Sequence, residues 1–255
     1  MILSEKAALV TGGSNGIGLG IAKSFIENGA EVAICARNSE KLEKAAALLL
    51  EQTGVKPMTV VCDVSKRDDV GQCVDLVMER FGRIDILVNN AGVQIFEPFL
   101  ELKEETWDNH FNVNIRGVFL ITQKVARIMA ERRQGKIINI SSDSGCYPLP
   151  DNAAAYCASK AALISLTRNI AKELGPLGVY CNCICPGAIK DTAMMDYFLD
   201  YTHGAGEKLC VEGAALRRMG TPKDIGDVAV FLASSMSDFI TGEKILATGG
   251  DLMSQ

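Results

Sequence analysis

The chain has 255 residues, of which 48% are hydrophobic and 22% are charged, and its formal net charge at pH 7 is −5. This length suits one large α/β domain, and the composition is too apolar for an intrinsically disordered chain. The negative charge argues against nucleic acids or an anionic membrane surface as partners, because both favour a basic face. We find neither a secretory signal nor an apolar run long enough to span a membrane, and therefore expect a cytoplasmic location.

Short apolar segments rich in Val, Ile and Ala alternate along the chain with longer segments of helical period. The short segments predict β-strands, and the longer ones predict amphipathic helices. Such alternation predicts a doubly wound α/β fold, with a seven-stranded parallel sheet and helices on both faces. The predicted strands are 7–11, 31–36, 58–63, 84–89, 136–141, 179–185 and 244–247, and the predicted helices are 17–28, 39–52, 67–81, 104–131, 152–174 and 222–234.

The local helix signals agree with these boundaries. Thr221 followed by Pro222 predicts an N-cap with proline in the first turn, and Ser65 predicts an N-cap for the helix at 67–81. Gly54 lies where the helix at 39–52 should end. No linker or repeat divides the chain, so we expect one domain over 1–255. The irregular stretch 188–219 is long enough to predict a substrate-binding loop or lid.

The nine cysteines are an odd number scattered through apolar segments, which indicates reduced, buried thiols rather than a disulfide framework. Cys181, Cys183 and Cys185 alternate along one predicted strand. Residues two apart on a strand are separated by roughly 6.5–7 Å, whereas sulfurs around one zinc ion lie about 3.8 Å apart. We therefore expect these three thiols to pack in the core, and we predict no metal site.

A glycine-rich loop follows the first predicted strand and leads into the first predicted helix. It reads Thr11-Gly12-Gly13-Ser14-Asn15-Gly16-Ile17-Gly18, a Gly-x3-Gly-x-Gly spacing. Glycines allow the backbone to approach a pyrophosphate, and the helix N-terminus attracts its negative charge. A tight turn without a ligand is the alternative, but the position between strand and helix favours a dinucleotide.

The end of the second predicted strand bears on which dinucleotide binds. An acidic residue there would accept hydrogen bonds from the adenosine ribose of NAD, but this chain has Arg37 and Asn38. A guanidinium can pair with a 2′-phosphate and stack on adenine. NADP(H) is therefore favoured over NAD(H), with a solvated surface arginine as the alternative.

Tyr156 and Lys160 are four residues apart at the start of a predicted helix, so their side chains share one face. A nearby ammonium stabilises phenolate and lowers the tyrosine pKa, as a general acid/base requires. Taken alone, such a pair is more often two surface neighbours. Ser142 ends a strand shortly before it, however, and ligands bind at the carboxyl ends of strands in such sheets.

These motifs, together with Asn89-Asn90-Ala91-Gly92, Asn114, Asp63-Val64 and Pro186-Gly187, closely resemble the short-chain dehydrogenase/reductase family over essentially the whole chain. The resemblance implies a Rossmann fold and a catalytic tetrad of Asn114, Ser142, Tyr156 and Lys160. The interval from Ser142 to Tyr156 is one residue longer than in many members, which leaves Ser141 and Ser144 as alternatives to Ser142.

The resemblance also implies a role for each member of the tetrad. Tyr156 would exchange a proton with the substrate oxygen while hydride moves to or from nicotinamide, and Ser142 would hold that oxygen. Lys160 would lower the tyrosine pKa and bind the nicotinamide ribose, and Asn114 would hold a water linked to Lys160. Besides Tyr156, Lys160, Arg37 and Asn38, the implied cofactor contacts are Gly12, Ser14, Asn15, Gly16, Ile17, Gly18, Asp63, Val64, Asn90, Ala91, Gly92, Pro186, Gly187, Ile189 and Thr192.

We expect the substrate to be a small carbonyl compound or secondary alcohol, because the candidate pocket residues are largely apolar. A hydrophobic ketone, such as a 3-oxoacyl, steroid or bile-acid compound, is favoured over a free sugar. For a carrier-protein substrate, Arg132 and Arg133 could dock the partner, although Leu177 stands where related reductases have an arginine. Besides Ser142, the candidate substrate residues are Gln94, Phe96, Asp143, Tyr147, Met194, Met195, Tyr197 and Phe198.

Other functions are weaker. The only two histidines, His110 and His203, lie in no ligand cluster, which argues against a metal-dependent dehydrogenase, and no Gly-x-Ser-x-Gly motif indicates a hydrolase. A dinucleotide sensor without catalysis is the main non-enzyme alternative. By resemblance we expect a homotetramer, or a homodimer, joined through 104–131, 152–174 and the last strand.

Overall fold

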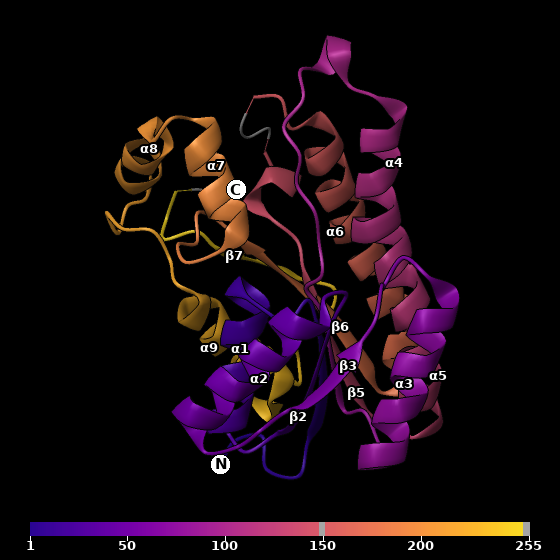
Figure 1. Ribbon diagram of the computed structural model, residues 1–255. Coiled ribbons are helices and arrows are strands. Elements are labelled where there is room, and N and C mark those ends of the chain that lie inside the picture. The colour runs from indigo at the N-terminus through magenta and orange to yellow at the C-terminus, as the bar shows by residue number, and fades with distance from the viewer. Residues whose placement is uncertain (148–150, 252–255) are drawn as a thin grey trace.

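A seven-stranded parallel β-sheet forms the centre of the computed structural model, which describes residues 1–147 and 151–251 (Figure 1). The strand order is β3-β2-β1-β4-β5-β6-β7, and every neighbouring pair is parallel. The order reverses beside β1, where crevices for ligands form at the carboxyl ends of the strands. The strands are β1 Ala7–Thr11, β2 Glu31–Ala36, β3 Met58–Val61, β4 Ile86–Asn89, β5 Gly135–Ile140, β6 Val179–Pro186 and β7 Lys244–Ala247.

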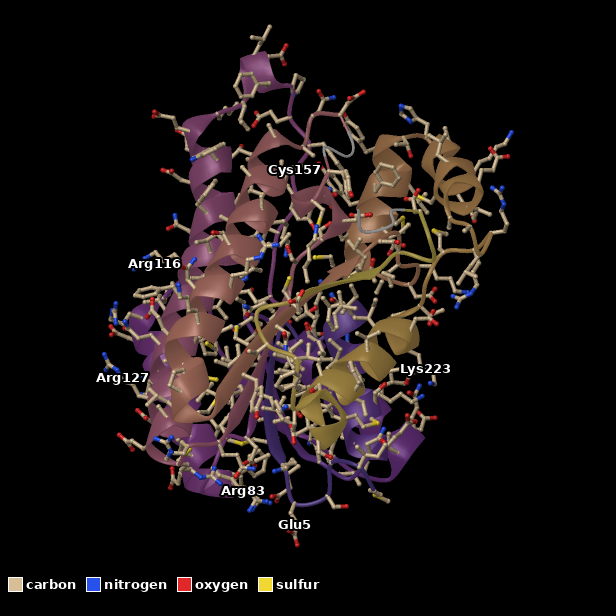
Figure 2. The ribbon with its side chains drawn as sticks, turned by 180° about the vertical axis from the view of Figure 1, so that it is seen from behind. Glu5, Arg83, Arg116, Arg127, Cys157 and Lys223 are labelled. Carbon is tan, nitrogen blue, oxygen red and sulfur yellow. The ribbon has the colours of Figure 1, made fainter. Side chains whose placement is uncertain are left out.

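Helices cover both faces of the sheet, as the views from opposite sides show (Figure 1 and Figure 2). One apolar layer joins α1, α2 and α9 to the sheet, and the other joins it to α3, α5 and α6 (Figure 1). All five residues of β1 are buried, as expected of a strand covered on both faces. The helices are α1 Gly16–Glu27, α2 Ser39–Thr53, α3 Arg67–Phe81, α4 Glu104–Phe111, α5 Val118–Glu131, α6 Ala154–Leu174, α7 Ala193–Tyr201, α8 Ala205–Gly213 and α9 Pro222–Ala233.

The doubly wound architecture predicted from the sequence is confirmed. Thr221 caps α9 in a reciprocal capping box with Asp224, and Gly54 ends α2 in the left-handed conformation. The predicted N-cap at Ser65 is wrong, because α3 begins after Lys66 and the Ser65 hydroxyl instead donates to the Asp63 carboxylate. The predicted helix over 104–131 contains a π-helical turn at Asn112–Gly117 between α4 and α5.

The stretch 188–219 is not irregular, as the sequence suggested, but contains the two nine-residue helices α7 and α8. Thr192 caps α7 through a hydrogen bond from the amide of Met195. None of the residues of α7 is fully buried, so this helix packs on the rest of the protein through partly exposed side chains. Both helices stand over the carboxyl ends of the strands (Figure 1).

Cys181, Cys183 and Cys185 are buried in the core, as predicted. The Sγ atoms of Cys183 and Cys185 lie 3.8 Å apart, which is closer than the spacing of residues two apart on a strand suggested. Side-chain rotation within the packed layer allows this approach although the backbone positions are further apart. Within residues 1–147 and 151–251, no helix is long and apolar enough to cross a lipid bilayer.

Candidate active site

A cavity of about 670 Å³ lies at the carboxyl ends of the strands. Its size falls within the range usual for cofactor and substrate sites. It extends from the glycine-rich loop and the end of β2 to the start of α6 and to α7 and α8. Of the residues predicted to bind cofactor or substrate, those on its wall are Gly12, Ser14, Asn15, Gly16, Ile17, Arg37, Asn38, Asp63, Val64, Asn90, Ala91, Gly92, Gln94, Ser142, Asp143, Tyr156, Lys160, Pro186, Gly187, Ile189, Thr192, Met194, Met195 and Phe198.

The glycine-rich loop is shaped by positions that exclude a side chain. Gly12 has φ +65°, and a Cβ there would lie 2.8 Å from Nδ2 of Asn90. A Cβ on Gly18 would lie 2.4 Å from the same atom, so Gly18 allows α1 to pack close to the loop rather than lining the cavity. Asn90 Nδ2 donates hydrogen bonds to the carbonyl oxygens of Thr11 and Gly12, at 3.0 and 3.1 Å. The loop is therefore held open beside the first turn of α1.

The start of α1 suits an anionic group. Asn15 is its N-cap but its side chain makes no capping hydrogen bond, and the first turn contains no acidic residue. The backbone N–H groups there and the positive end of the helix dipole favour a phosphate. The residues present thus fit the pyrophosphate of a dinucleotide.

The far end of the cavity bears positive charge. Arg37 and Asn38 follow β2, and Lys41 in the first turn of α2 also lines the wall. Asn38 is occupied as the N-cap of α2, where its Oδ1 accepts from the amide of Lys41 at 2.8 Å. Lys41 was not among the predicted residues, although its place in the first turn of the helix that directly follows Arg37 and Asn38 could have indicated it.

Asp63 lies in the loop after β3 and also lines the cavity. Burial opposes its ionisation, but hydrogen bonds from the hydroxyl and the amide of Ser65, and the charge of Arg37, lower the pKa of the carboxyl. The carboxylate is therefore ionised at neutral pH and already engaged with the protein.

Ser142, Tyr156 and Lys160 meet at the opposite end of the cavity. Ser142 follows β5, Tyr156 lies in the first turn of α6, and Lys160 is one turn further along the same helix. The Nζ of Lys160 lies 5.6 Å from the centre of the Tyr156 ring. A hydrogen bond between Ser142 and Tyr156 acts to lower the tyrosine pKa, so the two hydroxyl groups are neighbours.

The other two serines of this loop are differently engaged. The hydroxyl of Ser141 donates to the backbone oxygen of Lys160 at 2.8 Å, and that of Ser144 donates to the carboxylate of Asp143 at 3.2 Å. The hydroxyl of Ser142 also donates to this carboxylate, at 2.9 Å, but among the three serines it is the Ser142 hydrogen bond that acts on the pKa of Tyr156, which favours Ser142 as its partner.

The charge states differ from those expected from the Tyr–Lys spacing. Burial raises the pKa of Tyr156 above its usual value, with the Ser142 hydrogen bond opposing the rise, and burial lowers the pKa of Lys160 to about 8. The Nζ of Lys160 donates to the carbonyl oxygen of Ile140, at 2.9 Å.

Asn114 stands behind these residues, in the π-helical turn, and does not line the cavity. Its side-chain amide donates to the Val93 carbonyl and to the Ser159 hydroxyl, at 3.0 and 2.9 Å. Its Oδ1 accepts from the amide of Val93, at 2.9 Å. Asn114 thus ties the segment after β4 to α6 beside Lys160.

The histidines have no catalytic geometry. Buried His110 accepts a hydrogen bond from the amide of Ile95 at Nε2, while its Nδ1 faces the carbonyl oxygen of Thr106 at 2.7 Å. It holds the loop after β4, whereas His203 is exposed on the link between α7 and α8.

At the substrate end, the structure corrects part of the predicted lining. Tyr147, Tyr197 and Phe96 are not on the cavity wall, and Tyr197 instead stacks on Phe96 with ring centres 5.3 Å apart. Three further residues line this end of the cavity, two from α8 and one that follows β7. They were not predicted, because the sequence did not indicate α8. These residues are Leu209, Cys210 and Asp251.

Asp143 is a buried carboxylate at this end. Its Oδ1 accepts hydrogen bonds from the hydroxyl of Ser142, at 2.9 Å, and from the amide of Ser144, at 2.6 Å. Burial nevertheless raises the pKa of Asp143, and the charge of Asp251 adds to the rise. The substrate end therefore combines an apolar wall with a carboxylate that favours hydrogen-bond donors.

Arg132 and Arg133, considered above as docking residues for a carrier protein, lie between α5 and β5, at the amino-terminal edge of the sheet. Arg132 pairs with Asp85 at 3.3 Å, and Arg133 donates to the Pro176 carbonyl at 2.9 Å. They therefore lie at the opposite edge of the sheet from the cavity of the same chain.

Known proteins with the same architecture support this description. The family model described as short chain dehydrogenase matches residues 6–201. The chain is 39% identical to a 3-oxoacyl-(acyl-carrier-protein) reductase of Chlamydia muridarum, over 98% of each chain. A crystal structure of a short-chain type dehydrogenase/reductase from Mycobacterium marinum superimposes with a TM-score of 0.92 at 35% identity, covering 99% of this chain and 97% of the other.

A structure of NAD⁺-bound xylitol dehydrogenase gives a TM-score of 0.93 at 32% identity, covering 98% of this chain and 100% of that one. The match thus extends over the sheet, the glycine-rich loop and the helices that carry Tyr156 and Lys160. The chain belongs to the short-chain dehydrogenase/reductase family of NAD(P)-dependent oxidoreductases.

Proposed function

We propose that this protein is an NADP(H)-dependent oxidoreductase that interconverts a hydrophobic ketone and the corresponding secondary alcohol. The observation that carries the proposal is the single cavity that joins the basic end at Arg37 and Lys41 to the hydroxyls of Ser142 and Tyr156. A dinucleotide bound along the loop would reach from one end to the other.

Tyr156 is proposed as the proton donor in reduction and the proton acceptor in oxidation. Its hydroxyl donates to the sulfur of Met194, at 3.6 Å, and a thioether is only a weak acceptor. A substrate carbonyl oxygen would be a better acceptor at this position, and Ser142 would hold the same oxygen as negative charge develops. The nicotinamide ring, when bound, supplies or accepts the hydride.

Lys160 and Asn114 are proposed to support this proton transfer. The ammonium of Lys160 provides positive charge beside Tyr156 and a donor for the nicotinamide ribose. Asn114 positions the segment after β4 against α6, which keeps Lys160 in place, and we retain its proposed role in holding a water near Lys160. The side chains of Asn114 and Lys160 both come close to Gly92, since a Cβ there would lie 3.3 Å from Asn114 Oδ1 and 3.5 Å from Lys160 Nζ.

The cofactor preference is proposed from charge. Arg37 and Lys41 would pair with a 2′-phosphate, and no carboxylate stands at the end of β2 to bind the two ribose hydroxyls of NAD. An NAD(H)-dependent alcohol dehydrogenase is the alternative, since a similar structure is described as NAD⁺-bound. We propose that the other loop and strand-end residues predicted above contact the cofactor, with Gly18 acting through packing.

The substrate class follows from the wall near Tyr156. Met194, Met195, Phe198 and Leu209 offer apolar surface for a hydrophobic body, and Asp143 would accept a hydrogen bond from a hydroxyl or amine of the same molecule. The name of the Chlamydia relative makes a 3-oxoacyl compound one candidate. We propose that α7 and α8, within 188–219, form the lid over this substrate in a single domain that spans the chain.

Purified protein should oxidise NADPH faster than NADH with at least one ketone from a panel of 3-oxo esters, steroids, bile acids and small diketones. Tyr156→Phe protein is the control, because it should bind NADPH without turnover. Tight NADPH binding with no turnover on any member of the panel would favour the dinucleotide sensor instead.

The homotetramer and the cytoplasmic location stay predictions. Trp107 on α4 and Phe119 on α5 are partly exposed, at 39% and 42%. A neighbouring subunit that packs on the segment 104–131 would cover both side chains. Light scattering on the purified protein would give the number of subunits.

A further inference from the structure

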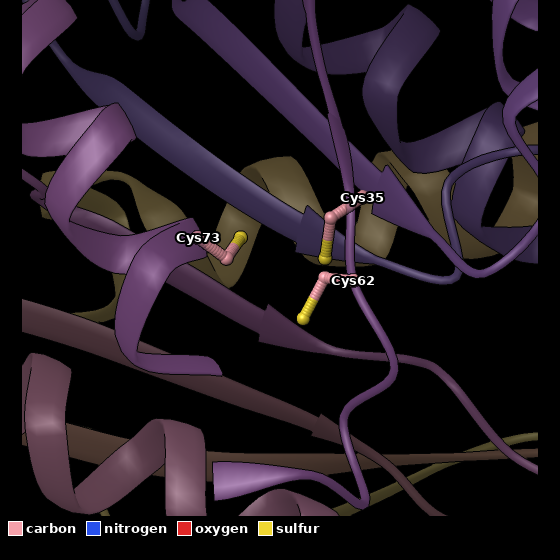
Figure 3. A group of neighbouring side chains, drawn as sticks. All are labelled: Cys35, Cys62 and Cys73. Atoms are coloured by element: carbon pink, nitrogen blue, oxygen red, sulfur yellow. The ribbon is translucent and has the colours of Figure 1, made fainter. Parts of the chain in front are cut away.

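Three cysteine side chains from separate elements point toward one another beneath the basic end of the cavity (Figure 3). Cys35 belongs to β2, Cys62 follows β3, and Cys73 belongs to α3. Their three Sγ atoms all lie within 4.8 Å of one another, and the residues are 0–1% exposed. This cluster could not be predicted from the sequence, because its members are far apart in the chain and have no metal-binding spacing.

The sheet register explains why the thiols meet. Cys35 pairs with Val60 across β2 and β3, and the amide of Cys62 extends the ladder by donating to the Ala36 carbonyl at 3.0 Å. Because side chains alternate along a strand, Cys62 lies on the same face as Val60, and this face is covered by α3. Cys73 lies on the buried stripe of that helix.

We propose that Cys35, Cys62 and Cys73 form a binding site for a thiophilic divalent metal ion of the Zn²⁺ type, held by three thiolates. Thiolates bind Zn²⁺ at about 2.3 Å, which places sulfurs around one ion about 3.8 Å apart. From separations of at most 4.8 Å, each pair must close by about 1 Å or less, which small rotations about the Cα–Cβ bonds can provide.

Binding of the ion would be coupled to loss of the thiol protons. Zn²⁺ binds cysteine as the thiolate, so it would form three zinc–sulfur bonds and release the three thiol protons to solvent, with no change in oxidation state.

The resulting site would carry one net negative charge, which Lys124 would partly balance. Its Nζ is fixed near α3 by the Gly71 carbonyl, at 2.8 Å, and by Asp75, at 2.7 Å. Asp69 lies one helical turn before Cys73 on α3, but its Oδ2 accepts from the amide of Asp63 at 3.1 Å. Three-sulfur coordination is therefore the expected first shell.

The site borders the proposed cofactor position, because Cys35 and Cys62 also line the cavity. Ion binding would fix the ends of β2 and β3 against α3. Ion binding does not require turnover, so a failure to bind Zn²⁺ can be distinguished from a failure of the proposed enzymatic function.

The test is Zn²⁺ binding by reduced protein at pH 7.5, measured by competition with a chromophoric zinc chelator. The wild-type protein should bind Zn²⁺ with X-ray absorption showing three sulfur neighbours, and its Tm should rise with added Zn²⁺. Cys73→Ala should weaken binding at least 100-fold and abolish the Tm shift.

Cys183→Ala is the matched control, because it removes a buried thiol that also has a sulfur neighbour, Cys185, at 3.8 Å. This variant should bind Zn²⁺ like the wild-type protein. If Cys73→Ala does not fold, Cys62→Ser gives the same comparison. The proposal is overturned if Cys73→Ala or Cys62→Ser keeps wild-type affinity, or if the wild-type protein does not bind Zn²⁺.

Discussion

The hydroxyl of Tyr156 lies 3.6 Å from the sulfur of Met194, the second residue of α7. This contact places α7 directly over the proposed proton donor. A substrate oxygen that accepts from Tyr156 must take the place of the thioether, so α7 has to shift or Met194 has to change rotamer when substrate binds.

Met194→Ala should raise KM for a hydrophobic ketone by about 10-fold, because it removes apolar surface that contributes about 1–2 kcal/mol. NADPH affinity should be unchanged, as Met194 contributes to the substrate end only. Steady-state kinetics and NADPH fluorescence titration would measure both. Met236→Ala, at a position 58% exposed and remote from the cavity, is the control. An unaltered KM in Met194→Ala would show that α7 does not contact the substrate.

Tyr156→Phe should lower kcat by about 10²–10⁴-fold, the usual contribution of a positioned general acid. The ring stays in its buried position, so the fold and the NADPH Kd should not change. Stopped-flow or steady-state reduction of the best ketone would measure the loss. Ser141→Ala should reduce kcat much less than Ser142→Ala, since the Ser141 hydroxyl donates to the backbone of α6. The opposite order would reassign the serine role.

Lys160 should make both activity and stability depend on pH near 8. Its pKa in the folded protein is lowered to about 8 from a usual value of 10.5. In the reductive direction, kcat should fall as pH rises through about 8, because the ammonium loses its proton while Tyr156, with its raised pKa, keeps its own. Lys160→Arg, which stays charged, should shift this decline to higher pH.

The same pKa shift has a consequence for stability. Below pH 8 the folded protein buries a charged ammonium at Lys160. Between pH 8 and 10.5 the unfolded chain binds more protons than the folded one, so the free energy of unfolding rises with pH over this range. Lys160→Met should therefore be more stable than wild type at pH 7, on the order of 2 kcal/mol. Urea unfolding at pH 7 and pH 9.5 should show the difference shrinking, and a difference that grows would contradict the burial argument.

Arg37 and Lys41 should set the cofactor preference together. Charged hydrogen bonds of this kind contribute about 1.5–3 kcal/mol, so Arg37→Asp should reduce the NADPH-to-NADH ratio of kcat/KM by about 10–100-fold. Lys41→Glu should act in the same direction but less strongly. Lys44→Glu on the same helix is the control, because Lys44 pairs with Glu40 and does not line the cavity. An Arg37→Asp protein that still prefers NADPH would exclude the proposed 2′-phosphate contact.

Most of the architecture could be predicted from the sequence. Strand–helix alternation is a local pattern, and a parallel sheet is the arrangement that covers both faces of such strands. Tyr156 and Lys160 share a helix, so their proximity follows from the helical repeat. Gly12 and Gly16 lie between a strand and a helix, where their positive φ values are needed for the loop.

Other features depended on contacts between distant segments. Helices α7 and α8 have nine residues each and bury only Gly206 between them, so their positions depend on how they pack over the cavity. The sequence placed Tyr147 and Tyr197 in segments near the cavity. It could not show whether their side chains line the cavity wall, because side-chain orientation depends on neighbours such as Phe96. The pKa of Tyr156 reflects burial, which spacing alone does not reveal.

The sequence by itself determined the family, the sheet and the residues that can carry hydride chemistry, because these are encoded in short patterns at strand ends. Only the tertiary structure decided that Leu209, Cys210 and Asp251 line the substrate end of the cavity, and that Cys35, Cys62 and Cys73 meet. Each of these depends on register and packing between elements far apart in the chain, and no local pattern of residues records that information.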